Sequence, residues 1–190
     1  AAAVDGLKQL ANPPPDHIKF VFLFADLEER GLAGSRHYAR SANLSDIVGA
    51  ISFDLCGIGN AVGIWDLREG DADSLIVQAL RRASQQEGVY HSTHGPVARF
   101  SSDHVSFIEM GVPGVGVTIV PRDDEVRLRA YVDNPNSFRW LVRNLRPRIF
   151  RTYHTPQDGP QTIDESALNL ARRVIVATVR ALDKLAAPAS

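Results

Sequence analysis

The chain has 190 residues, of which 44% are hydrophobic, and a formal net charge of −1, which fits a single domain with a substantial core. Its lysines and arginines form no long block, which argues against nucleic-acid binding. Cys56 is the only cysteine, so an internal disulfide and a cysteine-based zinc site are excluded. No apolar run approaches the ~18 residues of a membrane-spanning helix.

The first part of the chain predicts helices that alternate with strands. Residues 1–11 are expected to form a helix that ends before the prolines at 13–15. Residues 18–24 are apolar and rich in β-branched and aromatic side chains, which predicts a buried strand. A helix is expected over residues 32–42, and a second buried strand over residues 46–54.

The middle of the chain continues this alternation. Residues 60–65 predict a third strand, and residues 74–84 carry apolar side chains at helical spacing. A short helix is expected over residues 102–110, followed by a β-branched strand punctuated by glycines at 111–120. Strands alternating with helices are typical of an α/β sandwich.

The last part of the chain is predicted to be mostly helical. Residues 122–150 are polar, basic and aromatic by turns, and we expect them to lie on the surface with a helix over residues 136–145. Residues 162–185 carry one apolar face and predict a long closing helix. Thr162 and Glu165 have the spacing of a capping box at its start.

Three carboxylates follow predicted strands. Glu28 and Glu29 come just after the strand over 18–24, and Asp54 ends the strand over 46–54. The ends of parallel strands meet at one rim of a sheet, which is where open α/β sheets place their active sites. Adjacent acids repel each other and resist desolvation, whereas a metal ion turns that cost into attraction. A solvated loop, or a turn at Asp54, is the alternative.

Several histidines are candidates for the same site. His154 precedes a Thr-Pro pair, so its ring can point across a cleft from extended or turn backbone, although a surface position is the alternative. Two carboxylates and a histidine suit zinc. Ser102, Asp103 and His104 are adjacent and so cannot form a nucleophilic triad, because such residues must converge from separate elements. A helix cap, with His104 as a supporting or cleft residue, is expected instead. His91 and His94 have no acidic companion and make a poor metal site.

Four motifs carry a resemblance to a known family. They are LEERGLAGSRHY at 27–38, ISFDL at 51–55, SSDHVSFIEMGVPGVGV at 101–117 and YHTPQD at 153–158. In that order they resemble the co-catalytic zinc aminopeptidases, relatives of glutamate carboxypeptidase, the transferrin receptor and glutaminyl cyclase. The resemblance runs from the first predicted helix to the C-terminus.

The resemblance implies a role for each candidate residue. Glu28 corresponds to the general base, Glu29 and His154 to ligands of one zinc, and Asp54 to a ligand of the other. Tyr153 corresponds to a residue that stabilises the oxyanion in some members.

The resemblance also implies what surrounds those residues, and where this chain departs from the family. Asp103 and His104 line or support the cleft. Ser52 replaces the asparagine usual before the metal-binding aspartate, and the segment over 121–153 is longer than in many members. The first ligand histidine and the bridging aspartate precede the first helix in the family, so both are expected before residue 1.

Together these observations predict a single zinc-peptidase-like domain over residues 1–190, with a three-layer α/β/α sandwich around a mostly parallel mixed sheet. It is expected to be N-terminally incomplete relative to the family. The implied function is a zinc-dependent exopeptidase, an aminopeptidase before other kinds, that hydrolyses peptide bonds with a glutamate base and metal-bound water. The alternatives are a non-catalytic binding or assembly domain and a glutaminyl cyclase-like acyltransferase.

The resemblance also sets expectations for partners. The complete family site holds two zinc ions, and one or none is expected in this chain. Peptides or aminoacyl compounds are the expected substrates, and an open sheet edge favours self-association. The family leans towards exported or periplasmic proteins, although no signal-peptide pattern is visible at the N-terminus.

Overall fold

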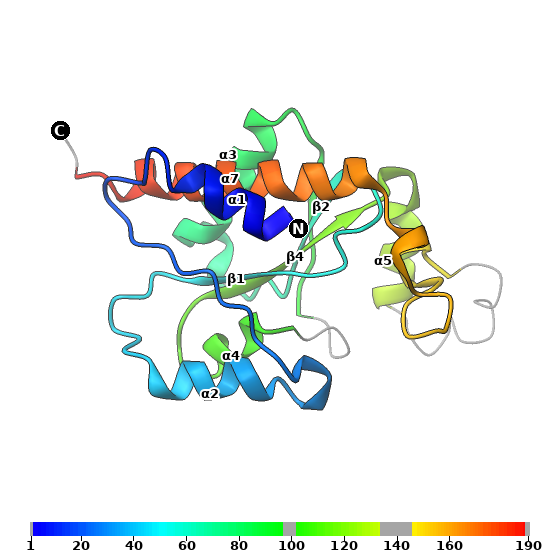
Figure 1. The fold of residues 1–190 in the computed structure, drawn as a ribbon, viewed down its shortest axis with the longest axis horizontal. Coiled ribbons are helices and arrows are strands. Elements are labelled where there is room, and N and C mark those ends of the chain that lie inside the picture. Colours follow the sequence, from blue (N-terminus) through cyan, green and yellow to red (C-terminus); the bar gives the residue numbers. More distant parts are fainter. Residues whose placement is uncertain (1, 97–101, 134–145, 189–190) are drawn as a thin grey trace.

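A mixed β-sheet forms the middle layer of the molecule, as Figure 1 shows. The structure is a computed structural model that describes residues 2–96, 102–133 and 146–188. Helices cover both faces of the sheet, which confirms the predicted three-layer α/β/α class. None of the helices within these ranges combines the length and the apolar character needed to cross a bilayer.

The sheet has four strands in the order β1-β4-β2-β3. Their bounds are β1 (Ala50–Phe53), β2 (Ala61–Trp65), β3 (His91–Thr93) and β4 (Gly114–Val120). β1 runs parallel to β4 and β2 runs parallel to β3, whereas β2 and β4 are antiparallel. Every residue of β2 and of β4 is buried, as their central positions in the sheet require.

Three helices cover one face of the sheet. They are α1 (Ala2–Leu10), α3 (Leu75–Gln86) and α7 (Glu165–Ala186). Between these helices and the sheet lies the main core, to which β2 and β4 contribute Val62, Ile64, Val115, Val117 and Ile119. The burial of so many aliphatic side chains is the largest favourable contribution to folding.

The opposite face is covered by α2 (Ala33–Ser41) and α4 (His104–Ile108). These helices are joined by a buried hydrogen bond of 2.8 Å between the hydroxyl oxygens of Ser35 and Ser106. α4 approaches the sheet closely because Gly114 has no side chain: a Cβ there would lie 2.8 Å from Cγ1 of Ile108.

A smaller core lies beside the main sheet and involves α5 (Glu125–Asp133). It packs Leu128, Ile149 and Phe150 against Trp65 of β2. The expectation that residues 122–150 lie on the surface is therefore wrong for these buried side chains. The helix expected over 136–145 falls outside the described residues.

Short 3-10 turns complete the chain, and one of them corrects the predicted cap of α7. These turns are Glu28–Arg30, Asp71–Asp73, Arg122–Asp124, Arg148–Phe150 and Pro160–Thr162. Thr162 thus ends a 3-10 turn, and its hydroxyl donates to the carbonyl of Gly159. Asp164 caps α7 instead, since its carboxylate accepts from the backbone N–H of Ser166 at 2.9 Å.

The strand predicted over 18–24 does not form. Residues 11–27, the connecting segment, run between the two helix layers (Figure 1). Within it Ile18, Phe20 and Phe22 are half-buried, while Val21 and Leu23 are exposed, so the alternation of a strand is present. The prediction is wrong because a strand also needs a hydrogen-bonded neighbour, and the described residues supply none for this segment.

Two further strand predictions need correction. β1 begins at Ala50 and not at residue 46, because the chain makes a turn there, in which the N–H of Ile47 donates to the carbonyl of Leu44 at 3.1 Å. β3 was not predicted: its three residues are too few to show a period.

Candidate functional site

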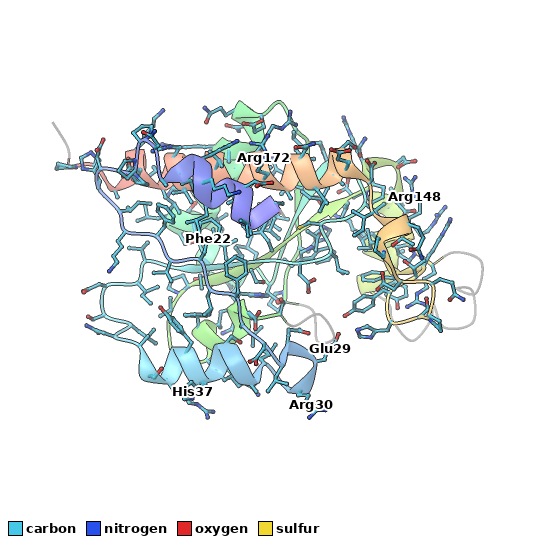
Figure 2. All side chains as sticks on the ribbon, in the orientation of Figure 1. Phe22, Glu29, Arg30, His37, Arg148 and Arg172 are labelled. Carbon is cyan, nitrogen blue, oxygen red and sulfur yellow. The ribbon has the colours of Figure 1, made fainter. Side chains whose placement is uncertain are left out.

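The two adjacent glutamates lie in a tight turn that leads into α2, where Figure 2 shows Glu29 and Arg30. Leu27 and Gly31 flank the turn, both in the left-handed region, with φ of 53° and 79°. The guanidinium of Arg36 donates to the carbonyl of Gly31 at 2.9 Å and so holds the end of the turn. A left-handed leucine is costly, and such residues cluster at functional sites.

Glu29 is in direct contact with His154, although 125 positions separate them in the sequence. The distance between Oε1 of Glu29 and Nε2 of His154 is 2.5 Å. Both side chains remain open to solvent, with exposed fractions of 66% and 55%. His154 has a φ of 58°, so its backbone is also held in the left-handed region.

Tyr153 lies beside this pair. Its ring stacks on that of His154 at 3.8 Å and meets the ring of Phe150 edge-on at 6.1 Å. Burial raises the pKa of Tyr153 to about 12, and the charges of Glu29 and Asp54 act in the same direction. The hydroxyl therefore remains a hydrogen-bond donor across the neutral range.

Glu28 is half-buried and lies among other carboxylates. Burial raises the pKa of Glu28, and the negative charges of Glu29, Asp54 and Asp103 raise it further, while His154 opposes them. A carboxyl group with a raised pKa is a better proton acceptor, which suits a general base.

Asp54 directly follows β1 and is exposed. Its backbone N–H donates to the carbonyl of Val117 at 3.0 Å, so the residue is still held by β4. Its Oδ1 accepts from the backbone N–H of Leu55 at 2.7 Å, and Leu55 is left-handed with a φ of 50°.

Asp103 and His104 differ from each other in their surroundings. Asp103 precedes α4, but its side chain makes no cap hydrogen bond there, so the expected side-chain cap is wrong for this residue. Its Oδ1 is buried and has no hydrogen-bond partner within the described part of the chain. His104 is 2% exposed and bonds to Ser52 and Asp66, below the open surface.

His91, His94 and Cys56 are not assigned to the candidate site. His94 is buried and stacks on Trp65 at 4.1 Å, and burial lowers the pKa of His91, as does the charge of Arg81. Burial raises the pKa of the Cys56 thiol to about 12, so this side chain is an unreactive part of the core.

The structure thus brings Glu28, Glu29, Asp54, Tyr153 and His154 into one electrostatic neighbourhood from three separate segments. Within this group Glu29 is hydrogen-bonded to His154, and the ring of Tyr153 stacks on that of His154. Across residues 2–96, 102–133 and 146–188, no three histidine, cysteine, aspartate or glutamate side chains form a group able to hold a metal. Carboxylate and imidazole donors suit zinc, but the set is incomplete, because a catalytic zinc normally has three protein ligands.

Sequence reasoning did not identify the partner of His104. Ser52 lies in β1 only two positions before Asp54, so its place in the sequence could have marked it as a neighbour of the site. Asp66 follows β2 without any motif around it. Its contact with His104 depends on the order of the strands in the sheet, which the sequence does not display.

Comparisons with known proteins agree with the resemblance. The model of peptidase family M28 matches residues 1–179. Among solved structures, the zinc aminopeptidase BSAP from Bacillus subtilis is 20% identical with a TM-score of 0.57, and the match covers 82% of this chain and 34% of that one. An aminopeptidase from Aneurinibacillus sp. strain AM-1 is 20% identical with a TM-score of 0.55, covering 82% and 31%.

A third structure, the LapA aminopeptidase from Legionella pneumophila, is 19% identical with a TM-score of 0.52, covering 83% of this chain and 38% of that one. At these identities the likeness shows a shared fold. The chain spans about a third of the length of these solved relatives. No curated protein matches it significantly. Because the family model covers nearly the whole sequence and the fold agrees with it, the chain belongs to peptidase family M28.

Proposed function

We propose that the chain carries the catalytic glutamate and part of the metal site of a zinc-dependent exopeptidase, an aminopeptidase before other kinds. The observation that carries this proposal is the contact between Glu29 and His154, which joins two distant segments directly beside Glu28. Burial and the charges of Glu29, Asp54 and Asp103 raise the pKa of Glu28, which agrees with it. A surface loop has no reason to gather four carboxylates, because their mutual repulsion costs stability. Perturbed carboxyl groups of this kind are frequent at active sites.

Glu28 would take a proton from the attacking water and return it to the leaving amine. A carboxylate that acts on water replaces a protein nucleophile, so no covalent intermediate between enzyme and substrate is expected. Tyr153 would donate its hydroxyl proton in a hydrogen bond to the oxyanion, which its high pKa permits at neutral pH. Asp103 and His104 would line or support the cleft.

Glu29 and His154 would hold one zinc, and Asp54 would hold a second. When bound, zinc polarises the scissile carbonyl and lowers the pKa of the attacking water. The short contact between Glu29 and His154 supports this assignment, since it brings a carboxylate and an imidazole together from distant segments. The other donors that the resemblance implies, a histidine and a bridging aspartate, are not among the residues that the motifs match.

A metal-free binding or assembly domain is the second candidate. It is favoured by the lack of any three-donor group among the described residues. The presence of Glu28 beside Glu29 favours the enzyme, because neither binding nor assembly calls for two adjacent carboxylates. In either case we propose that the exposed part of the connecting segment supports self-association.

The test replaces Glu28 by glutamine in the intact, metal-loaded protein. The amide keeps the shape of the side chain but cannot accept the proton, so we expect hydrolysis of a chromogenic aminoacyl substrate to fall by about 10²–10⁴-fold with zinc content unchanged. Glu69→Gln, at an exposed loop position, is the control and should keep full turnover. Metal analysis of dialysed protein accompanies each assay.

Two outcomes would contradict the proposal. Turnover by Glu28→Gln near that of the unchanged protein would exclude Glu28 as the base. An intact protein that binds no zinc and hydrolyses nothing would favour the binding domain. For residues 1–190 alone we expect at most one weakly held zinc and little turnover, because the described donors fall short of the three that a catalytic zinc needs.

A further inference from the structure

A buried chain of hydrogen bonds crosses the sheet below the candidate site. Oγ of Ser52 lies 2.8 Å from Nδ1 of His104, and Nε2 of His104 lies 2.8 Å from Oδ2 of Asp66. His104 is 2% exposed and Asp66 is 7% exposed. A carboxylate offers only acceptors, so Nε2 donates its proton to Asp66, and in the neutral ring Nδ1 then accepts from the hydroxyl of Ser52.

These three residues link three strands. Ser52 of β1 pairs with Gly116 of β4, and Gly116 pairs with Trp65 of β2, directly before Asp66. The imidazole of His104 lies over Gly116, where a Cβ would be 3.0 Å from Cε1 of the ring. The space for the ring therefore depends on a glycine in the middle strand.

The backbone at Asp66 also has an unusual conformation. Asp66 has a φ of 59°, a left-handed conformation that a residue with a side chain adopts at a cost. Burying a histidine and an aspartate costs further free energy unless each is fully paired. A buried network whose members are all hydrogen-bonded makes the elements that it joins more rigid.

The network does not have the form of a nucleophilic triad. In serine hydrolases the serine bonds to Nε2 of the histidine and the aspartate bonds to Nδ1, whereas here the two nitrogens are exchanged. The ring of His104 is also closed off from solvent. A role in holding the structure in place fits better than a role in attacking substrate.

The element that needs to be held is β1. It has four residues and pairs only with β4 among the described strands, so one of its edges has no ladder. Ser52 lies in β1, two positions before Asp54, which directly follows the strand. A hydrogen bond to Ser52 from the face of the sheet restrains the end of β1 at the point where the edge ladder is missing.

We infer that Ser52, His104 and Asp66 form a crossbar that fixes the end of β1 and thereby positions Asp54. In this role Ser52 and His104 are positioning residues, since neither reaches the reacting atoms. The importance of Asp54 rests on the proposed function, in which it holds a zinc.

The test compares Ser52→Ala with Ser52→Thr in the full chain. Alanine removes the hydroxyl, whereas threonine keeps it and suits a strand. Ser84→Ala is the matched control, because it removes another buried hydroxyl, on α3, which bonds to the carbonyl of Leu80 at 2.9 Å. Hydrogen exchange of the Asp54 amide is measured beside the global stability of each variant, with zinc affinity and turnover in the intact protein.

With Ser52→Ala we expect the Asp54 amide to exchange about tenfold faster than the loss of global stability explains, and zinc affinity or kcat to fall by about 10–100-fold, as for other residues that orient a ligand. Ser52→Thr should restore both. Ser84→Ala should change global stability alone.

One result would overturn the crossbar: the amide exchange rate of Asp54 changes only as much as global stability explains, and does so alike in Ser52→Ala and Ser84→Ala. Amide exchange needs neither zinc nor turnover, so this result is separate from a failure of the proposed function. An unchanged protein that neither binds zinc nor hydrolyses peptide analogues would overturn the proposed function while the exchange data still decide the crossbar.

Discussion

At the scale of single residues, Tyr153 offers the clearest test of how the site would stabilise negative charge. Its hydroxyl keeps its proton because the pKa is raised to about 12. Tyr153→Phe keeps the ring that stacks on His154 but removes the donor. If the hydroxyl serves the oxyanion, kcat should fall by about 10²–10³-fold, the usual cost of one such donor, with little change in KM.

The matched control is Tyr131→Phe, because the ring of Tyr131 packs on the same Phe150 at 5.3 Å. It should leave kcat unchanged in the same steady-state assay. Since the pKa of Tyr153 lies far above neutrality, the effect of Tyr153→Phe should be constant between pH 6 and pH 9. A kcat that survives the loss of the hydroxyl would assign the oxyanion to other donors.

Local pattern in the sequence points to individual residues, and their roles stay a prediction. Glu28, Glu29 and Asp54 are predicted because they follow apolar runs, and His154 because a Thr-Pro pair follows it. The crossbar was not predicted, because Asp66 and His104 meet only after β1, β4 and β2 lie side by side. Local pattern cannot report a contact that strand order creates.

At the scale of elements, the connecting segment is attached to α7 through Asp183. The carboxylate of Asp183 accepts from the backbone N–H groups of Asp16, His17 and Ile18 at 3.1, 2.6 and 3.2 Å. Burial by itself raises the pKa of Asp183, but the three hydrogen bonds outweigh it and the net pKa is lowered. The folded state therefore stabilises the ionised carboxylate of Asp183 relative to the protonated form.

Asp183→Asn should destabilise the protein at neutral pH by about 1.5–3 kcal/mol, the range for hydrogen bonds to a charged group. The folded-state pKa lies below the unfolded one, so this stability is present above the ordinary aspartate pKa and is lost as the pH falls through the lowered value. Urea unfolding of both proteins across the acidic range should show the difference shrinking towards low pH.

Asp5→Asn is the control for this comparison. Asp5 is exposed and pairs only loosely with Lys8, at 3.9 Å, so its loss should cost well under ~1 kcal/mol. A gap between Asp183→Asn and the unchanged protein that persists undiminished at low pH would contradict an ionised Asp183 as the anchor.

Element prediction succeeded where neighbours in sequence decide the outcome. The helices α1, α2, α3 and α7 and the strands β2 and β4 match the predicted segments within a few residues. The segment over 18–24 is rich in residues that favour strands, as β4 is, but it has no partner strand among the described residues and stays irregular. Strand propensity describes how well a residue suits a pleated, half-buried surface. The partner strand must come from another part of the fold.

At the scale of the whole molecule, an apolar surface accompanies the unpaired backbone of the connecting segment. Val21, Leu23, Phe24 and Leu27 have exposed fractions of 62%, 38%, 67% and 50%. The backbone groups of residues 19–25 make no hydrogen bond within the described part of the chain. Figure 2 shows Phe22 on this segment, at the level of the sheet.

An extended backbone with free donors and acceptors and an apolar flank is a template for pairing with another chain. We therefore expect the full chain to self-associate as its concentration rises, through residues 18–24 of two copies. Val21→Lys and Phe24→Lys should each weaken this association, because a charged lysine opposes close pairing at a strand edge. Sedimentation velocity over a wide concentration range measures the change in average mass.

The control must introduce the same charge at an equally exposed apolar position away from the segment. Val126 on α5 is 84% exposed, so Val126→Lys adds one positive charge without touching residues 18–24. It should leave the association unchanged, because the net charge of the chain alters by the same amount as in Val21→Lys while the segment keeps its apolar flank. A chain that stays monomeric at every concentration would remove the segment as an interface. Equal weakening by Val126→Lys would mean that overall charge, and not the connecting segment, governs association.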